Sequence, residues 1–276
     1  MSAVPDLAID APATVRILEG FLRSEVGRTG RNSVVLGLSG GLDSAVAAAL
    51  AVRALGPAAV HGVLLPHRLS SPASLRDAET LVGTLGIVAE KVDITPIVDG
   101  FLQAAGRVSA LRLGNVMARA RMIVLYDRSA ARHALVLGTS NKTELLLGYG
   151  TIHGDLAWAV NPLGDLYKTQ VRQLARHLRI PLAIRRKPPS ADLAPDQSDE
   201  GDLGFTYEAV DRLLAARIDA RVSREAAIAM GFDRALVDRV ERLVVANQFK
   251  RRPPVIAKVG TRTIGWDFRY PRDWRT

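Results

Sequence analysis

The stretch Leu36-Gly37-Leu38-Ser39-Gly40-Gly41-Leu42-Asp43-Ser44 decides the fold of this 276-residue chain, because it joins an apolar run to a helix-forming run. The run at 33–38 is short and apolar, as expected of a buried strand, whereas 44–55 is almost all Ala, Val and Leu and is long enough for a buried helix. The two glycines let the backbone turn sharply, so its N–H groups can approach an anion at the helix N-terminus. We therefore expect a phosphate-binding turn.

The polar side chains of this stretch suit a phosphate that is accompanied by a metal ion. Ser39 and Ser44 supply hydroxyl donors. Asp43 would repel a phosphate unless a divalent cation lay between them, so we interpret it as a magnesium ligand. The alternative is an ordinary strand-to-helix turn with Asp43 as the helix N-cap, which a lone Gly-Gly pair would favour.

Known nucleotide motifs narrow this choice. No Lys follows the glycines, so the stretch is not a GxxxxGK[ST] loop, and the GxGxxG fingerprint is absent. The stretch resembles the SGGxDS pyrophosphate loop of the ATP pyrophosphatases, which split ATP into AMP and pyrophosphate while they adenylate a carbonyl or carboxylate oxygen. The strand before it and the helix after it favour the phosphate interpretation.

The composition bounds the class of protein. The length suits one large α/β domain or two small ones, and no feature marks a linker, so we expect one domain over 1–276. No apolar run approaches the roughly 18 residues that a membrane span needs. Residues 1–15 lack the basic start and apolar stretch of a signal peptide, and there is no Cys. We expect a cytoplasmic protein that neither enters a membrane nor contains disulfides.

The net charge of +9, from 37 basic and 28 acidic residues, raises the question of nucleic-acid binding. The basic residues gather locally at 107–132, 172–187 and 250–258, without the interleaved aromatic residues that single-strand binders use. We interpret most of them as solvated helix faces and expect no nucleic-acid partner. Positive charge also suits a protein whose substrates carry several phosphates.

Apolar patterns along the chain predict strands that alternate with helices, which is typical of a doubly wound parallel sheet flanked by helices, here with extra C-terminal helices. In such a sheet, ligands bind beyond the carboxyl ends of the strands. The turn that starts at Leu65 should therefore contact a nucleotide base, and the junction at 138–144 should face the same site as the glycine-rich turn. Strands are expected at 33–38, 59–65, 88–93 and 134–137, and helices at 13–27, 44–55, 77–85, 96–106, 111–131, 170–178, 207–218, 224–230 and 234–249.

Three further features carry open alternatives. The segment 184–204 is rich in proline and acidic residues, so we expect an irregular, mobile lid. The four arginines of the helix at 111–131 either snorkel from an amphipathic helix or face a substrate or an interface. Lys168, expected just before a helix, either anchors a phosphate or caps carbonyls. The five histidines lack metal-ligand spacing, and only His153 is placed for a functional role.

Longer segments resemble the ammonia-utilising NAD synthetases over essentially the whole chain from Thr14 onwards. The family implies an adenine nucleotide α-hydrolase-like fold, a homodimer and a carbon–nitrogen ligase. Such a ligase adenylates the nicotinate carboxylate of deamido-NAD with ATP, releases pyrophosphate and lets ammonia displace AMP to form NAD. The segments that carry the resemblance are 38–44, 118–122, 138–148, Gly164-Asp165-Leu166-Tyr167-Lys168-Thr169-Gln170, 187–191 with 197–200, and 250–254.

The resemblance also implies site residues in three groups. Asp155 and Lys168 look catalytic: Asp155 would help to form neutral NH₃ from ammonium, and Lys168 would neutralise charge where adenylation occurs. The residues implied for ATP and pyrophosphate are Ser39, Gly40, Gly41, Asp43, Ser44, Leu65, Thr139, Lys168 and Ser190. The ligands implied for Mg²⁺ are Asp43, Glu144 and Asp155. The residues implied for the acceptor are Arg119, His153, Trp158 and Glu200.

One segment departs from the family pattern. Where the family reads FTKYGDGG followed by an acid, residues 150–159 place Ile152 at the lysine, Leu156 and Ala157 at the two glycines and Ala159 at the acid. One hypothesis is altered acceptor recognition, such as nicotinate mononucleotide or another carboxylate, with Trp158 as a stacking surface. The alternative that we favour is loop variation in a working NAD synthetase.

Two further alternatives concern turnover and the nitrogen source. A non-catalytic nucleotide-binding homologue is one, but a pure binder would not need both Asp43 and Glu144 beside phosphate. Without a cysteine, the chain cannot hydrolyse glutamine by cysteine chemistry. We therefore expect free ammonia, or a separate glutaminase partner, to supply the nitrogen.

Overall fold

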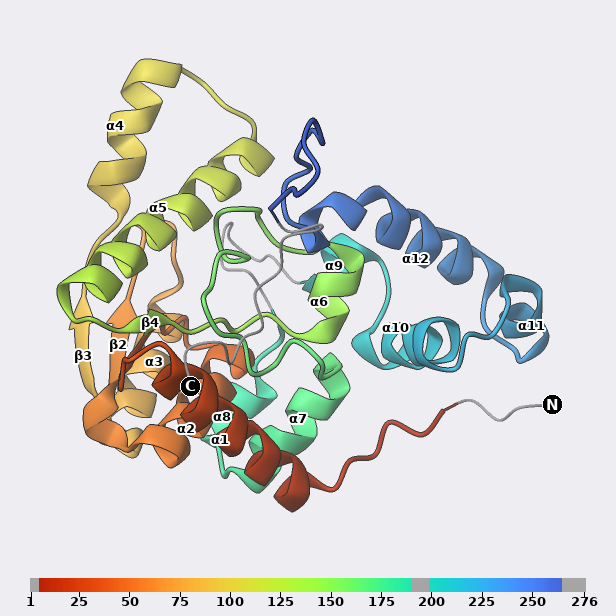
Figure 1. Cartoon of the computed structure of the whole chain (residues 1–276), viewed down its shortest axis with the longest axis horizontal. Helices are drawn as coiled ribbons and strands as arrows, with labels where there is room; N and C mark the ends of the chain where they lie inside the picture. The colour runs from red at the N-terminus through yellow and green to blue at the C-terminus, as the bar shows by residue number, and fades with distance from the viewer. Residues whose placement is uncertain (1–4, 190–198, 265–276) are drawn as a thin grey trace.

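The fold is built on a parallel sheet, as predicted. The computed structural model describes residues 5–189 and 199–264 (Figure 1). The strand order is β3-β2-β1-β4, and every pairing is parallel. Strand β1 therefore has a neighbour on each side, and the order reverses there, which is where open α/β sheets bind ligands beyond the strands' carboxyl ends. The strands are β1 Val34–Gly37, β2 Val60–Leu64, β3 Val88–Lys91 and β4 Leu135–Val136.

The helices agree with the sequence pattern in position but differ in some limits. Helix α3 begins at Pro72, five residues before the predicted start, because a proline suits the first turn of a helix. Lys168 is the first residue of α7 rather than the residue before it. The helices are α1 Ala11–Arg28, α2 Leu42–Leu55, α3 Pro72–Leu85, α4 Thr95–Ala105, α5 Ala110–Ala131, α6 Lys142–Leu147, α7 Lys168–His177, α8 Leu182–Arg186, α9 Asp199–Leu203, α10 Tyr207–Leu214, α11 Arg224–Ala229 and α12 Arg234–Ala246.

Two layers of helices cover the sheet, with α1, α2 and α7 on one face and α4 and α5 on the other (Figure 1). Successive strand residues point to opposite faces, so Val34 and Leu36 enter the core under α2 whereas Val35 packs with Met117 of α5. The buried face of α2 is mostly alanine, which lets this helix lie close to the sheet. The core therefore occupies both sides of β1.

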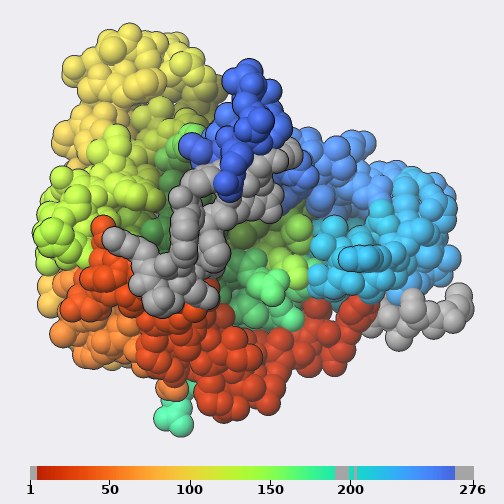
Figure 2. Space-filling model, viewed as in Figure 1, coloured from red at the N-terminus to blue at the C-terminus, as the bar shows by residue number. Residues whose placement is uncertain are grey.

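The C-terminal helices α10, α11 and α12 form a separate cluster at the side of the molecule, shown in cyan to blue in Figures 1 and 2. Their core includes Tyr207, Leu213 and Val237, and it reaches Leu147 of α6 and Tyr167 at the start of α7. Helices α6 and α7 thus join the sheet to the C-terminal helices. This arrangement places the first turns of α6 and α7 between the two halves of the molecule.

The prediction of irregular structure over 184–204 is wrong at both ends. Helix α8 continues to Arg186 and α9 begins at Asp199, whose backbone N–H donates to the Pro189 carbonyl at 2.9 Å. Residues 190–198, including Ser190, lie outside the described residues. The predicted helix at 207–218 changes to a π-helix at Ala215–Asp219. Within the described ranges, no helix is both long and apolar enough to cross a membrane.

Candidate active site

The turn between β1 and α2 is closed by its own serines. Ser44 Oγ donates to the Gly41 carbonyl at 3.1 Å and lies 3.2 Å from Ser39 Oγ, so the Ser39 hydroxyl donates to Ser44. Gly40 has φ = +72°, and a Cβ there would lie 2.1 Å from the Ser74 carbonyl oxygen. The turn therefore needs glycine at this position, and it presents the N-terminus of α2 to the site.

The second junction, from β4 into α6, is held by Asn141. Its side-chain oxygen accepts from Glu144 N at 3.0 Å, and Glu144 Oε2 accepts from Asn141 N at 3.3 Å, which is a capping box. Asn141 is fully buried and donates through Nδ2 to Asp43 Oδ1 at 3.1 Å. One side chain thus caps α6 and orients the carboxylate of the first junction. The two junctions meet, as the sequence predicted.

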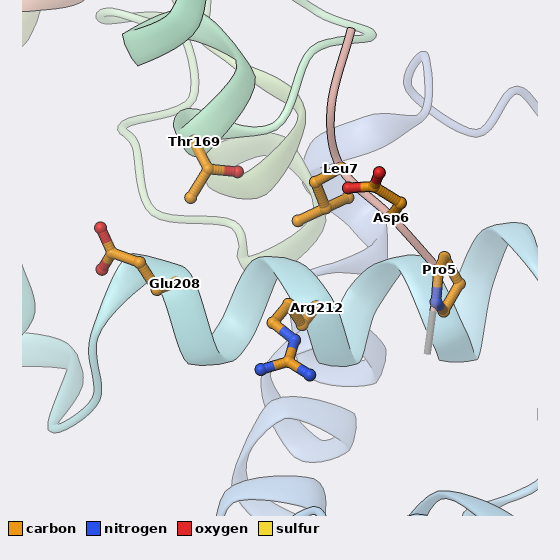
Figure 3. A pocket seen from close by; sticks show the side chains of 6 residues that line it. All are labelled: Pro5, Asp6, Leu7, Thr169, Glu208 and Arg212. Atoms are coloured by element: carbon orange, nitrogen blue, oxygen red, sulfur yellow. The ribbon is translucent and has the colours of Figure 1, made fainter. Parts of the chain in front are cut away.

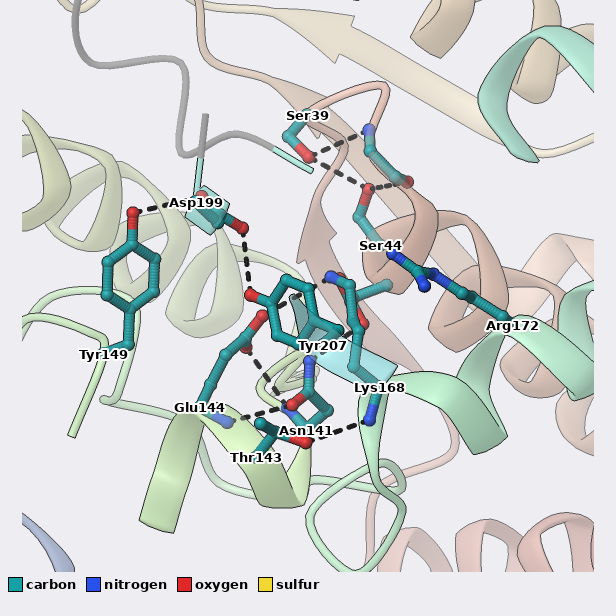
Figure 4. A network of polar contacts seen from close by, with 12 residues as sticks. Ser39, Ser44, Asn141, Thr143, Glu144, Tyr149, Lys168, Arg172, Asp199 and Tyr207 are labelled. Carbon is teal, nitrogen blue, oxygen red and sulfur yellow. Dashed lines mark hydrogen bonds and ion pairs between the residues drawn. The ribbon is translucent and has the colours of Figure 1, made fainter. Parts of the chain in front are cut away.

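Lys168 completes this cluster, as Figure 4 shows. It is only 3% exposed, and its Nζ forms an ion pair with Asp43 and lies 3.5 Å from Glu144 Oε1. The Tyr207 ring covers it, with Nζ 5.2 Å from the ring centroid. The start of α7 therefore delivers a buried ammonium to the two carboxylates.

Burial and mutual charge shift the pKa values of the groups in this cluster. Burial, and to a smaller extent the charge of Asp43, raise the pKa of Glu144 to about 8, although the charge of Lys168 lowers it. Burial lowers the pKa of Lys168, but the charges of Asp43 and Glu144 outweigh that effect and raise it. A third carboxyl, Asp199, has its pKa raised by burial while Lys168 opposes this. A bound cation would favour the ionised forms of Glu144 and Asp199.

Asp199 and Tyr207 extend the network beyond the residues predicted for the site. The Asp199 carboxylate accepts from the hydroxyls of Tyr149 and Tyr207, each at 3.1 Å (Figure 4). Asp199 lies in a segment that carried the family resemblance but was given no role. Asn141 was also missed, although the N-x-x-E spacing of Asn141 and Glu144 is a capping-box signal that could have identified it.

The segment 150–159, which departs from the family pattern, is held by hydrogen bonds from Lys250 and to Asp155. Lys250 Nζ donates to the carbonyls of Gly148 and Gly150 at 2.7 and 2.9 Å. Asp155 Oδ1 accepts from Thr151 N at 2.8 Å. Asp155 is exposed, yet the surrounding protein reduces its hydration and raises its pKa, against the hydrogen bond from Thr151 and the charge of Lys250. His153 is exposed with φ = +61°.

Asp155 is not part of the Asp43–Glu144 pair. Its link to the second junction is through the backbone, because Ser140 Oγ donates to the Asp155 carbonyl at 3.4 Å. In the part of the chain that the structure describes, no group of three or more His, Asp or Glu side chains is arranged to hold a metal ion. The three carboxylates named from the sequence as magnesium ligands are therefore not gathered into one site.

The other predicted residues have varied surroundings. Leu65 is buried, and its carbonyl accepts from Arg121 Nε at 3.1 Å. Glu200 caps α10 by accepting from Tyr207 N at 3.0 Å. Arg119 Nε donates to the Ile152 carbonyl at 3.3 Å, so it supports the 150–159 segment. Thr139 is half-buried in the β4–α6 junction.

Trp158 packs against the protein on one side. A Cβ on Gly138 would lie 2.6 Å from Trp158 Cγ, so the indole lies against the backbone of the β4–α6 junction. The ring also joins the core cluster under α5. Only the part of the indole that faces away from Gly138 is left for the stacking role predicted from the sequence.

A surface pocket of about 440 Å³ lies between the N-terminal arm, α7 and α10 (Figure 3). It contains none of the residues predicted for the site. Its charged residues include Glu208, which is already paired with Arg172. The Asp43–Glu144–Lys168 cluster lies outside this pocket. The residues that line the pocket are Pro5, Asp6, Leu7, Thr169, Glu208 and Arg212.

Comparisons with known proteins agree with this arrangement. The family model for NAD synthase matches residues 14–254. An NH₃-dependent NAD⁺ synthetase from Pelodictyon phaeoclathratiforme is 56% identical over 272 residues, which cover 99% of this chain and 98% of that protein. The structure of NH₃-dependent NAD synthetase from Campylobacter jejuni, in complex with nitrate, has a TM-score of 0.79 and 36% identity, covering 91% of this chain and all of that one.

A solved structure with a different name is equally similar in shape. The NMN synthetase from Francisella tularensis has a TM-score of 0.80 and 31% identity, covering 91% of this chain and 99% of that one. Both solved structures share the parallel sheet flanked by helices. The match of the family model and the identity to named relatives over nearly the whole length lead to one conclusion: this chain belongs to the NAD synthase family.

Proposed function

We propose that this protein is an ATP-dependent amidating ligase that converts deamido-NAD to NAD with ammonia, through an acyl-adenylate, and releases AMP and pyrophosphate. The observation that carries the proposal is that Asp43 and Glu144, at two strand-end junctions, meet Lys168 from the start of α7. A carboxylate is a poor electrophile, so the enzyme must mainly neutralise and align phosphates while the acyl phosphate forms. The names of the relatives support the same reaction.

The β1–α2 turn is the proposed seat of the leaving pyrophosphate. Ser39 and Ser44 offer hydroxyls, and the first backbone N–H groups of α2 point out of the turn. Lys168 adds a positive charge from the other side of Asp43. Together these groups oppose the charge that develops as the α–β phosphate bond breaks.

The donor set next to this turn fits Mg²⁺. Asp43 and Glu144 offer hard carboxylate oxygens, and Mg²⁺ is commonly bound by one or two carboxylates together with substrate phosphates. The pKa of Glu144 is raised first by burial and then by the charge of Asp43, so a bound cation would favour its ionised form. We assign Asp43 and Glu144 as the residues that would hold the ion. When bound, it would supply further neutralisation of phosphate charge.

Asp155 is proposed as the acid–base group on the ammonia side. The family resemblance also suggests it as a metal ligand, but it lies apart from the Asp43–Glu144 pair. Its raised pKa improves it as a proton acceptor, so it can take the proton of an arriving ammonium ion and leave NH₃ as the nucleophile. Arg119, His153, Trp158 and Glu200 remain the proposed acceptor contacts.

A second candidate function is amidation of nicotinate mononucleotide. The similarity to the structure named NMN synthetase favours it, as does the altered segment 150–159. Relatives with more than half of their residues identical are named NAD synthetases, so deamido-NAD is the preferred acceptor. Free ammonia is the proposed nitrogen source, with a separate glutaminase as the alternative.

The proposed assembly is a cytoplasmic homodimer of single-domain subunits. Its support is the exposed apolar surface of α5, a helix that otherwise covers one face of the sheet. Leu111, Ile123 and Tyr126 of this helix are exposed. Apolar surface gathered on one helix is typical of a subunit contact.

The test is to measure pyrophosphate and NAD formed from ATP, Mg²⁺, ammonium and deamido-NAD, with nicotinate mononucleotide as a parallel acceptor. Stoichiometric pyrophosphate and NAD, both dependent on ammonium, would support the proposal. Faster turnover of the mononucleotide would favour the second candidate. If neither acceptor yields pyrophosphate or an amide, both proposed activities are wrong.

A further inference from the structure

Asp211 of α10 is a fully buried carboxylate that neither the predicted site nor the proposed reaction uses. Its Oδ1 accepts from the Thr143 hydroxyl at 2.6 Å, and its Oδ2 accepts from the Thr169 backbone N–H at 2.8 Å. The two donors belong to different helices, because Thr143 lies in α6 and Thr169 in α7. One carboxylate therefore holds the first turns of both helices.

Thr143 completes a bridge between α6, α7 and α10, which consists of its own hydrogen bonds and those of Asp211. Its hydroxyl donates to Asp211 and accepts from the Lys168 backbone N–H at 3.0 Å. The first backbone N–H groups of a helix lack partners within the helix, so other groups must satisfy them. Those of Lys168 and Thr169 are satisfied from α6 and α10. The position of α7 is thereby fixed by side chains of two other helices.

This bridge lies next to the charged cluster on both helices. Thr143 directly precedes Glu144, and the backbone N–H held by Thr143 belongs to Lys168. The 3.5 Å separation between Lys168 Nζ and Glu144 Oε1 depends on how α6 and α7 sit relative to each other. Thr143 and Asp211 are fully buried, and Lys168 nearly so, which leaves the bridge little room to adjust.

We propose that Asp211 is a positioning residue that holds α6 and α7, through Thr143 and Thr169, so that Glu144 and Lys168 face the same phosphate region of ATP. The part of this proposal that concerns catalysis rests on the proposed function. Burial raises the pKa of Asp211 and so opposes its ionised form. A residue that served stability alone would not need a carboxylate at this buried position. A carboxylate is nevertheless the side chain that accepts from two donors at once.

The test compares substitutions that differ by one hydroxyl. Thr143→Val removes the hydroxyl and keeps the shape, whereas Thr143→Ser keeps both hydrogen bonds. Thr206→Val is the matched control, because Thr206 caps α10 at an exposed position outside the bridge. Asp211→Asn keeps the shape but removes one acceptor. Circular dichroism and thermal unfolding establish that each variant is folded.

Two readouts are taken on each variant. The first is kcat, with KM for ATP, deamido-NAD and ammonium. The second is the Kd of α,β-methylene ATP with Mg²⁺, by calorimetry, because this analogue resists cleavage at the reacting bond. We expect Thr143→Val and Asp211→Asn to lower kcat by about ten- to a hundred-fold, as substitutions behind a metal site do, and to weaken analogue binding. The KM for ammonium stays near its original value.

The pattern across variants distinguishes positioning from stability. Thr143→Ser and Thr206→Val should keep kcat and the Kd of the analogue within about two-fold of the parent protein. The Thr143→Val/Asp211→Asn double variant should lose no more activity than the more impaired of the two single variants. A folded Thr143→Val with unchanged kcat and analogue affinity would overturn the inference, as would an equal loss in Thr206→Val. If Asp211→Asn does not fold, the comparison of Thr143→Val with Thr143→Ser tests the inference.

Failure of the proposed function gives a different result. A parent protein that forms no amide from any acceptor would refute the proposed reaction. The analogue still reports on the phosphate site in that case, and the ratio of its Kd values for Thr143→Val and Thr143→Ser decides the inference by itself.

Discussion

Replacing Gly40 by Ala should be among the most damaging single-methyl changes in the molecule. A Cβ at this position would lie 2.1 Å from the Ser74 carbonyl oxygen and 2.9 Å from its carbon, and both atoms belong to the backbone of α3. Neither can rotate away, so the turn or the start of α3 must move. The φ of +72° adds a second penalty, because residues other than glycine disfavour the left-handed region.

The two penalties can be separated and summed. The left-handed backbone costs about 1–2 kcal/mol for an L residue. An extra methyl forced into a packed site costs about 1–3 kcal/mol more. The free energy of unfolding should therefore fall by about 2–5 kcal/mol, which is a large share of the roughly 5–15 kcal/mol typical of a folded protein.

The assay is urea unfolding of three alanine variants that share helix α3. Gly86→Ala, at φ = +63° with no atom within 4 Å of the new Cβ, tests the backbone penalty alone, and Gly83→Ala, inside the helix and unhindered, tests neither. The expected order of stability is Gly83→Ala, then Gly86→Ala, then Gly40→Ala. A Gly40→Ala variant no less stable than Gly86→Ala would refute the reasoning, because the clash would then have cost nothing.

Three further outcomes are expected. Lys168→Met should lower pyrophosphate release by at least about a hundred-fold, because it removes a preorganised charge from the phosphate site, and a rapid-quench assay with labelled ATP measures this. Burial raises the pKa of Asp211, so its contribution to stability is fully present below the pKa of an unfolded carboxyl, about 3.9, and is lost as pH rises through the folded pKa. Urea unfolding at a series of pH values should show a smaller decline for Asp211→Asn, and parallel curves would contradict this. Lys250→Met should cost about 1–3 kcal/mol in urea unfolding, because it leaves the two carbonyls that Lys250 binds without that donor. It should also raise the KM for ammonium more than the KM for ATP, and an equal change in both would argue against separate ATP and ammonia sides.

The parts of the site that the sequence predicted are those encoded in short stretches. The glycine-rich turn, the apolar run of α2 and the strand before it are contiguous, so their periodicity and turn chemistry suffice. The same holds for the β4–α6 junction, where Glu144 follows a strand end. Their meeting follows from a general property of parallel sheets, because the carboxyl ends of all the strands lie along one edge.

The parts that were missed depend on contacts between distant segments. Asn141 reaches Asp43 across 98 residues, and Asp211 reaches Thr143 across 68. No local pattern indicates either pairing, because a lone Asp in an amphipathic helix usually faces solvent. The contacts of Lys250 with the carbonyls of Gly148 and Gly150 were also beyond the sequence, because they too join distant segments.

Asp199 attaches the start of α9 to the rest of the molecule through both its backbone and its side chain. Its backbone N–H holds the Pro189 carbonyl, and its carboxylate holds two tyrosines from other parts of the chain. The first residue of α9 is therefore held at three points, and its carboxylate ties Tyr149 to Tyr207 of α10. A change at this one position would loosen contacts among three separate stretches of the chain, so residue 199 should tolerate substitution far less than an exposed helix start would.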